Sequence, residues 1–80
     1  MKTFEKLPVR IEAILVGDEN REEIEALPNV RKGPEGSYVL LSVSGGSVVA
    51  MKGEWICRNP GKDAYSILPS FHLRHNYKEL

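Results

Sequence analysis

The sequence predicts an α+β domain in which one short helix and a C-terminal helical turn pack on a mainly antiparallel sheet of about five strands. Three observations lead to this prediction. The chain has 80 residues, which suits one hydrophobic core and a single domain over residues 1–80. Hydrophobic residues make up 41% and charged residues 28%, a usage typical of folded globular proteins. Short segments rich in Val, Ile, Leu and Tyr alternate with turns of Gly, Pro and Asn.

The first predicted strand covers residues 9–16, where apolar side chains recur at every second position before the segment becomes apolar on both sides. A glycine and Asp18 end this strand, and a short helix is expected to follow up to about Leu27. Asp18 or Asn20 can cap that helix, and carboxylates in its first turn favour its positive end. Pro28 stops it.

A hairpin is expected in the middle of the chain. The segment 33–36 contains glycine and proline and reads as a turn, after which residues 37–43 form a strand rich in Tyr, Val and Leu. Gly45 and Gly46 accept the positive φ angles of a tight turn that leads into a strand at residues 48–51.

A second hairpin is expected from strands at residues 54–58 and 64–68, joined by a type II turn at residues 59–62. Ser70 can then cap a last helical turn. One face of this turn carries Leu73, Tyr77 and Leu80. In the core, Trp55, Ile56 and Tyr65 of this hairpin are expected to pack against Ile11, Ala13 and Leu15 of the first strand.

Apolar side chains also predict self-association. A small sheet leaves unpaired edges, and one short helix is not expected to cover all of Val39, Leu41, Val43 and Val49. A homodimer is the expected result.

The overall charge and the single cysteine restrict the environment of the protein. Eleven basic and eleven acidic side chains cancel, which removes a general attraction to nucleic acids or anionic membranes. Cys57 has no partner for an internal disulfide, as is typical of proteins kept in a reducing cytosol. The first five residues carry no apolar signal core, and the apolar run at residues 13–16 is far shorter than the roughly 20 residues of a membrane span.

Short motifs over most of the chain match a known pattern. Residues 7–14 read LPVRIEAI, residues 52–56 KGEWI, residues 61–65 GKDAY, and a Pro, a Phe and a Tyr follow within residues 69–77. This order resembles a group of small, mostly uncharacterised phage and prophage proteins with a K-P-V-x-V-E-A-I-Q-W start and the segments P-G-D-W-I, G-E-F-Y and P-D-I-F-x-x-T-Y-E.

The chain departs from this pattern at several positions. Lys52 replaces a proline, Val16 stands in the usual tryptophan region, and the ending is one residue longer and carries two histidines. The resemblance implies a phage origin, and therefore the cytoplasm of a bacterial host, and it implies a fold more than an activity. It supplies no catalytic residues.

Candidate metal and nucleophilic groups are few. His72 and His75 are three residues apart and would share one side of a helix, with Cys57 or Asp63 as further zinc ligands. Since a zinc site of this kind takes four ligands and only two are convincingly spaced, a solvated terminal turn is favoured, and neither metal nor cofactor is expected.

Cys57 is also the candidate nucleophile, because the adjacent Arg58 can favour its thiolate. The alternation with Ile56 in a strand instead favours a buried, small apolar side chain. The sequence has no accompanying catalytic triad, paired carboxylates or phosphate loop. The chain is therefore expected not to be an enzyme.

Charge is divided unevenly along the chain, with a net −3 over residues 1–27 and +3 over residues 28–80. The acidic partner-binding candidates lie on the expected helix: Glu19, Glu22, Glu23 and Glu25. The basic candidates are Arg58, Lys62, Arg74, His75 and Lys78, which alternate with Trp55, Tyr65, Phe71 and Tyr77. An ordinary solvated surface is the alternative explanation for both sets.

These observations favour a small phage-encoded accessory protein without enzymatic activity, which binds and modulates a host or defence protein. Small size, separated surface charge and the lack of a catalytic constellation suit stoichiometric binding. A first alternative is capture of a nucleotide or single-stranded nucleic acid by the basic and aromatic set. A second is a minor structural protein of the phage.

Overall fold

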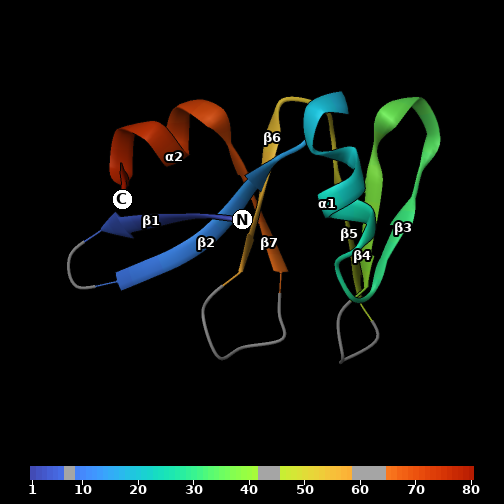
Figure 1. Cartoon of the computed structure of the whole chain (residues 1–80), viewed down its shortest axis with the longest axis horizontal. Helices are drawn as coiled ribbons and strands as arrows, with labels where there is room; N and C mark the ends of the chain where they lie inside the picture. The colour runs from blue at the N-terminus through green and yellow to red at the C-terminus, as the bar shows by residue number, and fades with distance from the viewer. Residues whose placement is uncertain (7–8, 42–45, 59–64) are drawn as a thin grey trace.

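The computed structural model describes residues 1–6, 9–41, 46–58 and 65–80. Within these ranges the chain forms two α-helices, two short 3-10 turns and two antiparallel sheets of five and three strands (Figure 1). The predicted α+β class is confirmed. The division into two sheets was not predicted.

The five-stranded sheet has the order β7-β6-β2-β1-β8. Its strands are β1 (Lys2–Lys6), β2 (Val9–Leu15), β6 (Glu54–Arg58), β7 (Tyr65–Pro69) and β8 (Lys78–Glu79). Strand β2 lies at the centre because its alternating and then wholly apolar side chains can be buried on both faces of the sheet. It pairs with β1 on one side and with β6 on the other, where Ile14 lies opposite Ile56 and Leu15 opposite Trp55.

The three-stranded sheet has the order β3-β4-β5 and contains the expected central hairpin. Its strands are β3 (Val30–Lys32), β4 (Tyr38–Leu41) and β5 (Ser47–Ala50). A 3-10 turn at Asp18–Asn20 leads into helix α1 (Arg21–Glu25), which lies beside this sheet (Figure 1). A second 3-10 turn, Pro34–Gly36, joins β3 to β4 at the predicted turn.

Asn20 occupies the N-cap position of α1, as predicted, but the expected side-chain capping hydrogen bonds are absent at both helices. Asp18 and Asn20 make no capping hydrogen bond to the start of α1, and the Asn20 amide instead donates to the backbone carbonyl of Leu15 at 2.9 Å. Helix α2 (Ser70–Asn76) begins after Pro69, and the Ser70 hydroxyl accepts a hydrogen bond from the Trp55 indole at 3.1 Å. In both places the polar side chain forms a hydrogen bond with a strand residue and not with the end of the helix.

The core consists of two clusters. One holds Ile14, Val16, Ile24, Tyr38, Leu40, Ala50 and Ile56, and the other holds Phe4, Ile11, Ala13, Trp55, Cys57 and Leu73. Trp55 lies with the first-strand residues, as predicted, but Ile56 and Tyr65 belong to the opposite cluster. Adjacent residues of a strand point to opposite faces, so Trp55 and Ile56 cannot pack on the same side.

The C-terminal turn is a helix of seven residues, and its predicted apolar face is only partly buried. Leu73 is fully buried and Tyr77 is half-buried, but Leu80 is 57% exposed. The helix ends at Asn76 and strand β8 follows, so Leu80 no longer has the helical spacing that the prediction assumed. The glycine turn at Gly45 and the turn at residues 59–62 lie outside the described residues.

Candidate functional site

The predicted acidic candidates all lie at the surface of α1 and the turn before it, but only half of them are without ion pairs. Glu23 contacts the N-terminal amine at 3.2 Å, and Glu25 lies 3.9 Å from Arg21 and 3.6 Å from Lys32. Glu19 and Glu22 form no ion pair within the described part of the chain. The acidic surface open to a partner is therefore smaller than the sequence suggested.

The basic candidates do not share one surface. Arg58, the last residue of β6, pairs with Glu12 at 3.0 Å, and this hydrogen bond raises the pKa of Arg58. The Arg74 guanidinium lies 5.9 Å from the centre of the Trp55 ring, near the start of the same strand. Lys62 lies outside the described residues. His75 on α2 and Lys78 on β8 are exposed.

The aromatic side chains that were predicted to accompany these cations are mostly committed to the fold. Trp55 is 3% exposed and packs edge-to-face on Phe4, with ring centres 5.3 Å apart. The Tyr65 hydroxyl donates to the Pro28 carbonyl at 2.9 Å. Phe71 is 76% exposed and is the open aromatic side chain among the described residues of the set. A stacking platform for bases would need several such rings.

One cleft does unite residues from both predicted sets. It has a volume of about 400 Å³, and its lining includes Glu19 and Glu23 from α1 and the turn before it, Arg74 from α2 and Trp55 from β6. Met1 and Lys2 add two further positively charged groups. Charges of both signs thus line this cleft.

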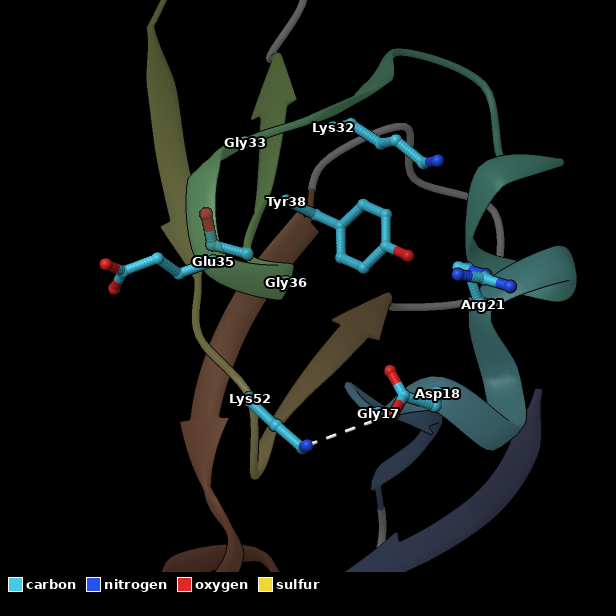
Figure 2. Close-up of a pocket in the computed structure, with 10 residues that line it drawn as sticks. Gly17, Asp18, Arg21, Lys32, Gly33, Glu35, Gly36, Tyr38 and Lys52 are labelled. Carbon is cyan, nitrogen blue, oxygen red and sulfur yellow. Dashed lines mark ion pairs between the residues drawn. The ribbon is translucent and has the colours of Figure 1, made fainter.

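A second cleft, which we call the cationic cleft, was not predicted. It measures about 390 Å³, and its charged lining consists of two carboxylates, Asp18 and Glu35, and three cations: Arg21 of α1, Lys32 of β3 and Lys52 from the turn after β5 (Figure 2). Tyr38 stands between them, and Gly17, Gly33 and Gly36 contribute bare backbone. No local motif marks this site, because the three cations are separated by more than ten residues in sequence.

The outer face of the three-stranded sheet is the third candidate surface. The pairing register places Arg31, Val39 and Val49 in one row and Leu41 and Ser47 in the next. The opposite face of the sheet carries the buried Tyr38 and Leu40. Val49 is 52% exposed, and Met51, directly after β5, is 48% exposed. Val43, also predicted to be on this surface, lies outside the described residues.

The remaining candidate groups among the described residues are one buried cysteine and two exposed histidines. Cys57 is buried, as predicted, and burial raises its pKa to about 11, so the thiolate is disfavoured. His72 and His75 lie on exposed positions of α2. Across the described ranges there is no group of three or more His, Cys, Asp or Glu that could hold a metal ion.

Comparisons with known proteins add no relative. No protein-family model, no curated protein and no solved structure matches the chain. In the part of the chain that the structure describes, no helix has the length and apolar character needed to cross a membrane. Function must therefore be inferred from the three surfaces themselves.

Proposed function

We propose that the chain is a small, non-enzymatic accessory protein of a phage or prophage that docks on a host or defence protein in the bacterial cytoplasm and modulates it. The observation that carries this proposal is the apolar outer face of the three-stranded sheet, on which Val49 is about half exposed, together with the similarly exposed Met51 directly after β5. The phage origin comes from the sequence resemblance alone and is part of the proposal.

The energetics of this face suit protein binding. Each large apolar side chain that moves from water into an interface contributes up to about 1.5–3 kcal/mol, so Val39, Val49 and Met51 together offer several kcal/mol. The backbone beneath them is held by the β3-β4-β5 hydrogen bonds, which keeps the face in one shape before binding. A preformed face lowers the entropy cost of association.

Charge favours a different protein over a second copy of this chain. Arg31 lies in the same row as Val39 and Val49 and is exposed, and within the described ranges it forms no ion pair. The rows of this face contain no carboxylate that a second copy would present to Arg31. We therefore propose a partner with an apolar patch bordered by an acidic side chain. A homodimer through the same face is the alternative.

The test uses two changes on the face and one matched control elsewhere. The immobilised protein captures partners from bacterial lysate, and the affinity of the isolated partner is then measured by calorimetry. Val49→Glu and Arg31→Glu should each abolish or strongly weaken binding. Phe71→Glu, an apolar-to-acidic change at a more exposed position on α2, should leave it intact. Circular dichroism melts verify that all three variants fold.

Sedimentation equilibrium of the free protein distinguishes a face that binds a partner protein from one that binds a second copy of this chain. A mass near 9.0 kDa leaves the face available to a partner protein. A mass of about twice that value, which Val49→Glu returns to the single-chain mass, would assign the face to a second copy. A partner that binds both outer-face variants as tightly as the natural chain would refute this docking surface.

A further inference from the structure

We infer that the cationic cleft binds a small ligand that carries a phosphate ester. This site is independent of the proposed docking surface, because Lys32 and Tyr38 are paired in register and lie on the face of the three-stranded sheet opposite to Val39 and Val49. A ligand can therefore occupy the cleft while a partner protein occupies the outer face.

The cations of the cleft are only loosely paired with carboxylates. Arg21 and Lys32 share one carboxylate, Glu25, at 3.9 and 3.6 Å, and Lys52 lies 4.0 Å from Asp18. These separations exceed hydrogen-bonding distance, whereas the Arg10–Glu5 and Arg58–Glu12 pairs elsewhere are at 2.9 and 3.0 Å. The N–H groups of the three cleft cations are thus not committed to their carboxylates.

The directions of the donors favour a tetrahedral oxyanion. Arg21, Lys32 and Lys52 stand around the Tyr38 ring from three separate elements, and the Glu35 side chain is turned away from the ring (Figure 2). A planar carboxylate is satisfied by one guanidinium in its own plane, but a phosphate group presents oxygens toward donors on several sides. The lining holds Arg21, Lys32 and Lys52 against the carboxylates of Asp18 and Glu35, so it carries one net positive charge, and Glu25 is the further carboxylate with which a phosphate would compete.

Tyr38 adds a neutral donor. Burial, and then the neighbouring Glu25 carboxylate, raise the pKa of its hydroxyl, so the hydroxyl stays protonated. Its hydrogen bond to Glu25 is long, at 3.5 Å. A ligand oxygen in the cleft can therefore compete with Glu25 for this proton, and it would also compete for Arg21 and Lys32.

The uncharged part of the ligand has room beside bare backbone. The volume of about 390 Å³ falls within the range of small-ligand sites. At Gly17 and Gly36, a Cβ atom would meet nothing within 4 Å. Because Gly17 has an extended backbone, with φ −179°, other residues can replace it without backbone strain. A large side chain there would extend into the cleft and block it.

The experiment measures binding of ribose 5-phosphate and AMP by calorimetry, with ribose and adenosine as controls that lack phosphate. We expect both phosphate esters to bind, the controls not to bind, and affinity to fall as salt is raised. Lys52→Gln and Arg21→Gln should each weaken binding roughly tenfold or more. Lys2→Gln is the matched control, since Lys2 is similarly exposed and pairs with Glu79 at 3.7 Å outside the cleft.

Two further variants separate a binding site from damage to the fold. Gly17→Leu should abolish binding while the melting temperature stays close to that of the natural chain. Glu25→Gln removes the carboxylate shared by two cleft cations and should tighten binding. Absence of binding at millimolar phosphate ester would overturn the inference, and so would equal losses in the Lys52→Gln and Lys2→Gln variants. Neither result bears on the outer-face partner.

Discussion

Replacing Trp55 by alanine should remove a large part of the free energy of unfolding of this protein. The side chain is 3% exposed, packs edge-to-face on Phe4 at 5.3 Å and donates its indole N–H to Ser70 at 3.1 Å. Removing a buried tryptophan costs about 3–5 kcal/mol. At about 0.05–0.15 kcal/mol per residue, a chain of this length has only about 4–12 kcal/mol of total stability. The loss is therefore comparable with the total stability only at the lower end of that range.

Two milder variants divide this cost into its parts. Trp55→Phe keeps an aromatic ring beside Phe4 but loses the indole N–H and part of the buried area, so we expect a loss of about 1–2 kcal/mol. Ser70→Ala keeps the ring and removes the acceptor of the indole N–H, which costs about 1–3 kcal/mol because a buried donor is left without its partner. Phe71→Ala, next in sequence but 76% exposed, should stay within about 0.5 kcal/mol.

Thermal melts and urea titrations followed by far-UV circular dichroism measure these differences, since Trp55 is the only tryptophan and its fluorescence disappears with it. A loss of 1 kcal/mol lowers the melting temperature of a domain of this size by about 4–8 °C. A Trp55→Ala variant that melts within a few degrees of the natural chain would contradict the burial of Trp55 in the core. That result would place the indole at the surface and make it a candidate binding anchor.

Three other expectations follow from the contacts of single groups. Burial raises the pKa of the Cys57 thiol from 9.0 to about 11, so the thiol should resist alkylation in the native state. The free energy of unfolding, measured by urea titration, should fall as pH rises from about 9 to 11, because the unfolded chain loses the thiol proton first. Rapid labelling of the native protein would contradict the burial of Cys57. The double variant Glu19→Lys, Glu22→Lys should shift the melting temperature little, because neither glutamate is ion-paired in the described part of the chain. If α1 faces a basic partner, the same double variant should slow association with that partner. An unchanged association rate would exclude α1 from the interface. A double-mutant cycle on Arg58 and Glu12 should give a coupling of at most about 1 kcal/mol, because both side chains are about one-third exposed; a much larger coupling would mean that the pair is buried in solution.

Alternation and turn residues predicted the parts of the fold that bury several apolar side chains. Strand β6 has the expected bounds, and β2 and the two hairpins lie where the pattern placed them. Strands β1 and β3 were missed because each has one apolar residue that packs into the core, Phe4 in β1 and Val30 in β3. Such strands form because a neighbouring strand offers hydrogen-bonding partners, and their own composition carries little signal.

Side-chain partners were less predictable than strands. The net charge of −3 over residues 1–27 predicts an acidic helix that faces solvent. In the structure Glu25 meets Lys32 of β3, and Glu23 meets the N-terminal amine, so part of the acidic charge is neutralised by residues far away in the chain. Ion pairs of this kind depend on the pairing of strands, which a segment sum does not contain.

The cationic cleft also depends on contacts between elements that lie far apart in the sequence. Three different segments of the chain supply Arg21, Lys32 and Lys52, and each has an acidic residue nearby in sequence or in space. The sequence therefore contains no run of basic residues that would indicate this site. The three cations come together because the β3-β4-β5 sheet places Lys32 beside Tyr38, while packing of Ile24 in the core holds α1, and with it Arg21, next to that sheet. A site made in this way is set by the core beneath it. Substitutions at Ile24 should therefore change ligand binding at the cleft without touching any of its cations, whereas substitutions at Phe71 should not.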